Sequence, residues 1–346
     1  MNLFIKKIYF ILIITCLIFF HNHGLTRESK EFSKDDISNY LSGIISSNKN
    51  FDDKALKHFS KVQFLKSEYQ TFNARYIYTL ILLEKFDEAF AFSKQIQRKN
   101  QPFFEVDLLL GLNYFLKKDY FNAEKYFLRV KKNSYTNFIF NDFLGDILII
   151  WNLAEKNKAE DVYKIFNNIP DRYFNLKQIQ NIFLSCYLDS PKAEKILKET
   201  LENDDNNFPR YNYFYANYLI SKNKIEEAKI VISRSRIKNS SNLLLKQTEN
   251  FILDGKSKNV NAFFNCKNSA NNIAEFFYII ANLYSTDKNY KLSNFYLKIA
   301  LFLNKKFLPY KVLLAENYYH QNRIKLSKKN FSINQINRAS LFMVFY

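Results

Sequence analysis

Glycine and proline are scarce in this chain of 346 residues, which contains 5 of each. An all-β sandwich needs many tight turns, and a doubly wound α/β fold needs glycine-rich phosphate loops, so this composition excludes both. Hydrophobic residues make up 47% of the chain and charged residues 24%. Such a chain can bury a large core and is not disordered throughout. The composition predicts an all-α protein.

Cysteine and histidine are also few. The three cysteines are Cys16, Cys186 and Cys266, with no C-x-x-C spacing among them. A disulfide framework needs more cysteines at closer spacing, and a structural zinc site needs four clustered ligands. We therefore expect Cys186 and Cys266 to be buried as small hydrophobic side chains. His21 and His23 lie beside the apolar N-terminal run, and His58 and His320 are isolated, so we predict no metal site and no cofactor.

The familiar motifs of catalysis are missing as well. The sequence contains no G-x-G-x-x-G, G-x-x-x-x-G-K, H-E-x-x-H or G-x-S-x-G. Asp142 and Asp146 have the four-residue spacing of some acid–base and metal sites, but no third group converges on them. We therefore predict that the protein is not an enzyme and has no small-molecule substrate.

The charge is unbalanced, with 51 Lys+Arg against 33 Asp+Glu and a net charge of +18. Lys, Asn, Ile, Phe and Tyr are abundant and have A/T-rich codons, so genome bias explains the excess as readily as selection for an anionic partner. An RNA-binding helical array, with tyrosines that stack on bases and lysines that contact phosphates, is the alternative function. The interspersed charge, without a long basic run, argues against nucleic acid.

An apolar run near the N-terminus, residues 8–20, follows Lys6 and Lys7. Thirteen helical residues extend about 20 Å, less than the roughly 30 Å hydrocarbon core, which favours a signal peptide over a spanning helix. No A-x-A-like cleavage site follows, so an uncleaved membrane anchor stays open. We assign 1–25 to the signal peptide or anchor and 26–35 to a linker. The expected location is the periplasm or the periplasmic face of the inner membrane, with the cytoplasm as the alternative.

Small residues recur along the rest of the chain with a period near 34. The series is Ala55, Ala89, Ala123, Ala159, Ala193, Ala228, Ala262, Ser293 and Ser327. Gly43, Gly111 and Gly145 are separated by multiples of 34 and lie 12 to 14 residues before one of these alanines. A period of this length indicates helical units that stack, because one helix pair cannot bury its apolar face alone.

The third copy carries the best motif, with Leu110, Gly111 and Tyr114 in its first helix and Ala123 and Phe127 in its second. This pattern resembles the tetratricopeptide repeat, of the bacterial exported or membrane-anchored type. The opening tryptophan of that repeat is absent, and the seventh copy is irregular. The resemblance covers 36–334 and implies an α-solenoid of about nine antiparallel helix pairs in a right-handed superhelix. The residues expected to pack between helices are Gly43, Ala55, Ala89, Gly111, Tyr114, Ala123, Phe127, Gly145, Ala159, Ala193, Ala228, Ala281, Ser293, Ala315 and Ser327.

The resemblance also implies a binding groove, lined by the first helix of each pair. Its expected residues are Tyr78, Leu112, Phe115, Tyr213, Asn217, Tyr278, Asn282 and Tyr319, with Val312 and Glu316 at the matching positions of the ninth copy. Asparagine can pair with peptide amides and tyrosine adds contact area, a combination that suits an extended peptide. Several of these residues could instead pack between helices. The predicted function is a protein–protein interaction scaffold of the cell envelope, whose polypeptide partner the sequence does not identify.

The chain finishes with an apolar tail, residues 335–346, which ends in SLFMVFY. Repeat arrays need a polar cap for solubility, and this tail is not one. We expect either that the tail docks on the last repeat or on another protein, or that the sequence is a truncated form of a longer array.

Overall fold

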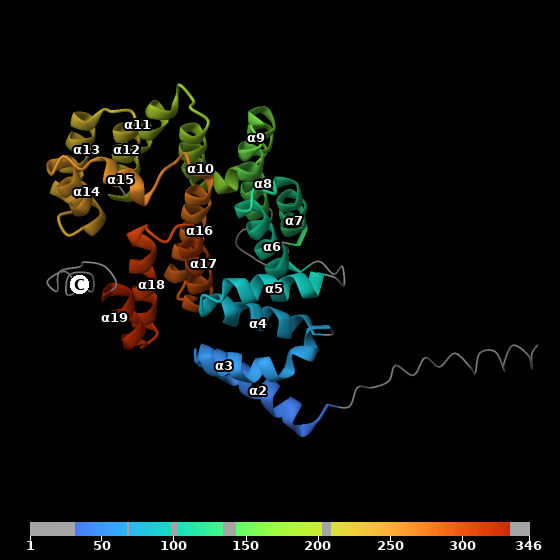
Figure 1. Ribbon diagram of the computed structural model, residues 1–346. Coiled ribbons are helices and arrows are strands. Elements are labelled where there is room, and N and C mark those ends of the chain that lie inside the picture. The colour runs from blue at the N-terminus through green and yellow to red at the C-terminus, as the bar shows by residue number, and fades with distance from the viewer. Residues whose placement is uncertain (1–31, 68, 98–102, 134–142, 203–208, 333–346) are drawn as a thin grey trace, which may run out of the picture.

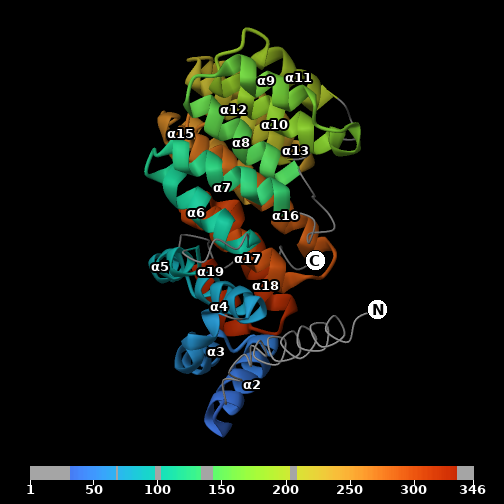
Figure 2. The ribbon, with the colours of Figure 1, turned by 90° about the vertical axis from the view of Figure 1, so that its right-hand side faces the viewer.

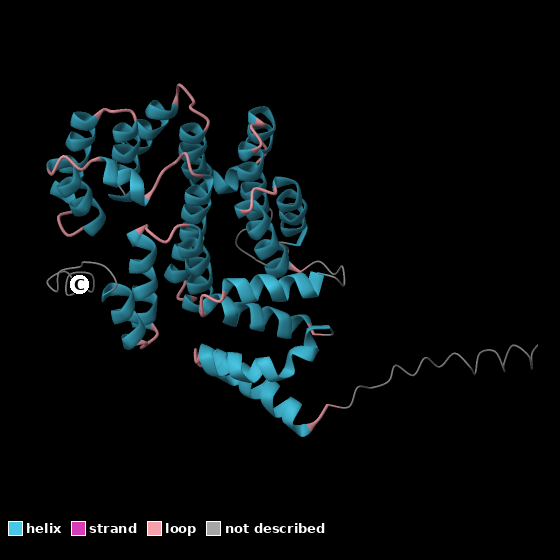
Figure 3. Ribbon diagram, viewed as in Figure 1, coloured by secondary structure: helices cyan, strands magenta, loops and turns pink. Residues whose placement is uncertain are grey.

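The computed structural model describes residues 32–67, 69–97, 103–133, 143–202 and 209–332. These residues form helices joined by loops, with no strand among them (Figure 3). The predicted signal peptide or anchor and the apolar tail lie outside the described residues.

Within this part of the chain, the α-helices form nine consecutive pairs. They are α2 (Lys34–Asn48) with α3 (Asp52–Phe59), α4 (Gln70–Leu82) with α5 (Phe86–Gln97), α6 (Phe104–Leu116) with α7 (Tyr120–Asn133), α8 (Phe143–Glu155) with α9 (Ala159–Asn167), α10 (Phe174–Tyr187) with α11 (Ala193–Glu202), α12 (Pro209–Ser221) with α13 (Ile225–Lys238), α14 (Leu243–Leu253) with α15 (Lys258–Phe263), α16 (Ser269–Thr286) with α17 (Tyr290–Leu303), and α18 (Leu308–His320) with α19 (Ile324–Ser332). Two 3-10 helices, η1 (Ser60–Ser67) and η3 (Asp171–Tyr173), precede α4 and α10. The predicted all-α solenoid of about nine helix pairs is confirmed.

The turn inside each described pair has the same backbone form. One residue of each turn adopts a left-handed conformation; these residues are Asn50, Glu84, Lys118, Asn157, Asp189, Asn223, Gly255, Lys288 and Asn322. The next amide then donates to the carbonyl five residues back, as Asp119 does to Tyr114 at 3.0 Å. This is the Schellman ending of a helix, which satisfies carbonyls that the helix leaves unpaired.

Small residues allow the paired helices to approach closely. A Cβ atom at Gly111 would lie 2.5 Å from the ring of Phe127, and one at Gly43 would lie 2.5 Å from the ring of Phe59. The expected packing residues that are buried are Gly43, Ala55, Ala89, Gly111, Ala123, Phe127, Gly145, Ala193, Ala228, Ala281, Ser293, Ala315 and Ser327. Tyr114 is half-buried and stacks on Tyr126.

Two alanines of the 34-residue series do not hold a packing position. Ala159 and Ala262 are exposed, and the buried residues in their place are Val162 and Val260. The left-handed turn residue of the fourth pair comes 39 residues after that of the third, not 34. The extra residues move the second helix of that pair along the sequence, so Val162 lies five residues after the turn, as Ala123 does in the third pair.

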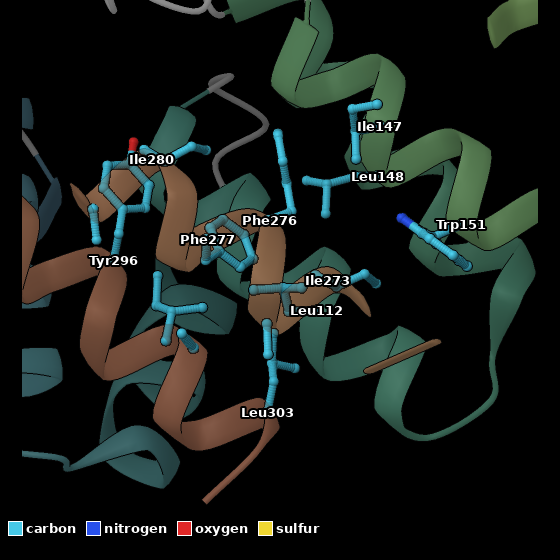
Figure 4. Packing of buried hydrophobic residues seen from close by; sticks show 14 of the residues in the cluster. Leu112, Ile147, Leu148, Trp151, Ile273, Phe276, Phe277, Ile280, Tyr296 and Leu303 are labelled. Carbon is cyan, nitrogen blue, oxygen red and sulfur yellow. The ribbon is translucent and has the colours of Figure 1, made fainter. Parts of the chain in front are cut away.

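The stack turns back on itself after the seventh pair. Outside its own pair, α16 packs mainly against α8, α10 and α18, while α17 packs against α18 and α4. Figure 1 shows α16 and α17 in the middle of the molecule, between α8 and α18, and Figure 2 shows them against the stack formed by α6 to α8. In Figure 4, Leu112 of α6 and Ile147 of α8 lie in one apolar cluster with Phe276 and Phe277 of α16.

Polar contacts also join the last two pairs to the first two. Lys298 lies 2.5 Å from the carboxylate of Glu84, and Arg323 donates to Asp52 at 3.1 Å. The inner side of the solenoid is therefore filled over much of its length by helices of the same chain.

Cys186 and Cys266 form a disulfide, which corrects the expectation of two free, buried thiols. The two residues are 80 apart in sequence, yet their Cα atoms lie 6.0 Å apart. Cys186 belongs to α10, and Cys266 belongs to the segment that leads from α15 into α16. The return of the chain toward α10 brings them together, and no local spacing of cysteines encodes that return.

Candidate functional site

The groove residues predicted in the first half of the chain lie against the chain's own helices. The ring of Tyr78 stacks on Phe295 of α17, with centroids 4.2 Å apart. Leu112 and Phe115 are 1% and 4% exposed. A partner cannot reach Tyr78 or Leu112 unless α16 and α17 move away. The ring of Phe115 packs against Tyr120 and Phe127 of α7.

Tyr213 and Asn217 bind peptide groups, but those groups belong to the same chain. Tyr213 donates a hydrogen bond to the carbonyl of Val260 at 3.1 Å, and Asn217 donates to the carbonyl of Phe264 at 2.8 Å. Both side chains are buried. They hold the segment that leads into α16, so this part of the predicted groove is occupied from within.

A pocket of about 660 Å³ remains where α12, the α13–α14 loop, α16 and α18 meet. Tyr278 and Asn282 of the predicted groove line it, together with Val312 and Glu316. Its apolar wall includes Leu244, Ile279, Leu283, Leu308 and Leu313, and its polar rim includes Lys238, Asn239, Ser240, Ser241 and Asn242. Tyr319, the last predicted groove residue, is 43% exposed on α18 and does not line this pocket.

One wall of the pocket is a buried ion pair. Arg210 donates through Nε and Nη2 to the two carboxylate oxygens of Glu275, each at 2.5 Å, and Tyr310 donates to the same carboxylate at 3.2 Å. The guanidinium also lies over the ring of Tyr278, 3.6 Å from its centroid. Burial alone would lower the pKa of Arg210, but the Glu275 charge raises it overall. Arg210 therefore stays charged and its charge is matched, so this wall is structural.

Glu316 lines the same pocket, but no cationic side chain among the described residues pairs with its carboxylate. Within the described part of the chain, its carboxylate has neither an ion pair nor a hydrogen bond. Burial raises the pKa of Glu316 to about 7. Asn282 is exposed and its side-chain amide also has no hydrogen bond to a described residue. The pocket thus offers one carboxyl and one amide for an incoming ligand.

Of the Asp142 and Asp146 pair considered for acid–base or metal chemistry, the structure describes only Asp146. Asp146 is paired with Lys131 at 2.7 Å. Among the described residues, no group of three or more His, Cys, Asp or Glu is placed to hold a metal ion. None of the described helices is long and apolar enough to cross a membrane.

Sequence reasoning missed the wall of the pocket and its rim. Arg210 and Glu275 are 65 residues apart, and no motif connects them. The polar run 239–242 lies between the sixth pair and the irregular seventh. Its polarity and the asparagine at the start of α14 mark a loop in the sequence, but they do not show that α16 and α18 face it.

Comparison with known proteins gives little beyond this geometry. No family model matches the chain, and no curated protein matches it. Solved structures similar to it include the APC/C hetero-tetramer Cut9–Hcn1 and Naa15/Naa10 bound to HypK-THB, each at 12% sequence identity. The matches cover 89% and 86% of this chain and 75% and 63% of those chains, with TM-scores of 0.25 and 0.22.

Proposed function

We propose that the protein is a non-catalytic interaction scaffold that holds an extended segment of a partner polypeptide in the pocket between α12, α16 and α18. The observation that carries this proposal is the contrast between the filled and the open parts of the inner face. Helices of the same chain cover Tyr78 and Leu112, whereas Tyr278 and Asn282 line a pocket of about 660 Å³.

The lining suits a peptide in its chemistry. Apolar side chains such as Ile279 and Val312 can receive apolar side chains of a partner, and the amide of Asn282 can both donate to and accept from a peptide group. The polar run 239–242 supplies further hydrogen-bonding groups at the rim. The lining therefore combines apolar side chains with a similar share of polar ones, and such a surface can contact both the side chains and the peptide groups of an extended segment.

The test is a selection of phage-displayed random octapeptides on the full-length protein. We expect peptides to be enriched on the wild type and lost on Asn282→Trp, because the larger side chain fills the pocket from an exposed position. Lys229→Trp, at an exposed position on α13 that does not line the pocket, is the matched control and should select the same peptides as the wild type.

Circular dichroism on all three proteins checks that helix content is equal. The proposal fails if the wild type enriches no peptide, or if Asn282→Trp enriches the same peptides as the wild type. Binding of nucleic acid alone by the wild type, lost steeply with added salt, would favour the RNA-binding alternative.

We also propose that the protein works outside the cytoplasm, in the cell envelope. The disulfide between Cys186 and Cys266 supports this location, because such bonds persist in oxidising compartments. The apolar run 8–20 after two lysines supports it as well. Fractionation of the native cells, followed by maleimide labelling of the denatured protein without reductant, should recover the protein with the envelope and leave Cys186 and Cys266 unlabelled. Recovery in the cytosol with both thiols labelled would overturn the proposal.

A further inference from the structure

The two carboxylates of the pocket differ in what they contact. Glu275 is matched by Arg210 and Tyr310, and it is fully buried. Glu316 is half-buried on α18 and faces the same pocket with no ion pair or hydrogen bond to a described residue. A carboxylate shielded from water without a partner is costly, and an incoming cation removes that cost.

The surroundings of Glu316 favour a long aliphatic side chain with a charged end. Val312 lies one helical turn before it on α18, and Leu283 lies in the pocket wall on α16. Lysine and arginine place their methylene groups along apolar surface while the charged head reaches a polar partner. A small inorganic cation would gain nothing from this apolar wall.

The other charges at the pocket do not compete for this role. Arg210 is neutralised by Glu275. Lys238 is exposed at the rim, where solvent and salt screen its charge. The net charge of +18 works against basic ligands at long range, so any preference for them must come from a local carboxylate.

We infer that the pocket recognises a lysine or arginine side chain of the partner segment, whose cationic head pairs with the carboxylate of Glu316. This inference rests on the proposed function, because it names the chemistry of the polypeptide that the pocket holds. Asn282, which occupies the position matching Glu316 one repeat earlier, pairs with the backbone next to that side chain.

The test uses fluorescein-labelled octapeptide libraries in which one central position is fixed as Lys, Arg, Gln, Glu or Leu and the others are mixed. Fluorescence anisotropy with the full-length protein, in salt near the physiological concentration, measures the affinity for each library. We expect the wild type to bind the Lys and Arg libraries about tenfold more tightly than the Gln library. Glu316→Gln should abolish this preference, and Glu316→Lys should move it to the Glu library.

Glu226→Gln is the matched control, because it removes an exposed carboxylate from α13 that does not line the pocket. It should keep the preference of the wild type. Equal binding of all libraries by the wild type would overturn this inference and leave the proposed function standing. An unchanged preference in Glu316→Gln, or an equal loss in Glu226→Gln, would overturn it too. No binding of any library by the wild type would overturn both the inference and the proposed function.

Discussion

Gly111 shows at the scale of one residue why small side chains recur in this chain. The ring of Phe127 lies only 2.5 Å from the place that a Cβ atom of residue 111 would take, so the two helices of the third pair approach across a glycine. Ala159 belongs to the alanine series of the same period but is exposed at the start of α9. The period alone does not show that Gly111 is buried and Ala159 exposed, because extra residues before the turn of the fourth pair shift the register of that pair's second helix.

These two residues provide a matched pair of substitutions. Gly111→Leu should lower the free energy of unfolding by about 2 kcal/mol or more, because the larger side chain displaces a fully buried ring. Ala159→Leu should change it by less than about 0.5 kcal/mol, as expected for an exposed site. Urea unfolding followed by circular dichroism measures both. Equal effects of the two substitutions would contradict the packing described for Gly111.

Glu316 should make stability depend on pH. Its pKa is about 7 in the folded chain against an ordinary value of 4.5, so the folded state holds the proton more tightly than the unfolded state. Below pH 4.5 the group is protonated in both states, and as pH rises from 4.5 to 7 the folded state loses stability relative to the unfolded state. Glu316→Gln removes this pH-dependent loss of stability, because glutamine does not ionise. At pH 8 we expect the variant to be more stable than the wild type by about 1–2 kcal/mol, a figure reduced for the water that still reaches the pocket.

Thermal unfolding of both proteins at pH 4.5 and pH 8 measures this difference. The expected gap is present at pH 8 and nearly absent at pH 4.5. A gap of the same size at both values would mean that burial of the ionised carboxylate is not its cause.

At the scale of the helix pair, the most regular feature of the repeat is the backbone conformation of the turn between the two helices. Each described pair has a left-handed residue at the same point, and Gly255 is the only glycine among them. Asparagine fills several of these positions, as at Asn50 and Asn223, since it tolerates this conformation better than most residues. The fourth and seventh pairs keep this turn conformation, although Ala159 and Ala262 of the alanine series are exposed there.

Lys118 is a turn residue that carries strain which a glycine would not. Lys118→Gly should raise the free energy of unfolding by about 0.5–1 kcal/mol, because glycine adopts the left-handed conformation without a Cβ clash. Lys117→Gly, one residue earlier at a φ of −84°, should instead lower it by a similar amount. Urea unfolding compares the two directly, and stabilisation by neither variant would contradict the strained turn.

The helix pairs could be predicted from sequence because the signals for them are local. A period near 34, small residues at crossings and polar residues at turns all lie within one unit. The pocket and the filled groove depend on contacts between residues that are far apart, such as Lys298 with Glu84, which are 214 residues apart. No local sequence pattern shows that the chain turns back at the eighth pair and packs α16 and α17 against earlier helices. The sequence therefore predicts that Tyr213 and Asn217 contact a partner, whereas their hydrogen bonds go to the chain's own backbone.

At the scale of the whole molecule, the disulfide holds the segment before α16 beside α10, where the chain turns back. It closes a loop of 80 residues between α10 and the start of α16. Closing a loop of this length contributes about 2–4 kcal/mol, because it restricts the unfolded chain. We expect Cys186→Ser/Cys266→Ser to lose about that much stability and to exchange amide hydrogens faster in α16 and α17. Unchanged exchange in these helices would mean that their packing against α4 and α8 holds them without the disulfide.

Hydrogen–deuterium exchange of the full-length protein, alone and with a peptide selected by phage display, tests whether the chain's own helices fill the inner face and leave only the pocket for a partner. The account predicts slow exchange in α4, α6, α16 and α17 of the free protein, because these helices fill the inner face together. Adding the peptide should then slow exchange only in the segments that line the pocket, which are the start of α12, residues 238–244, and parts of α16 and α18. Rapid exchange of α16 and α17 in the free protein, or new protection of α4 and α6 with the peptide, would show an open groove and contradict the account.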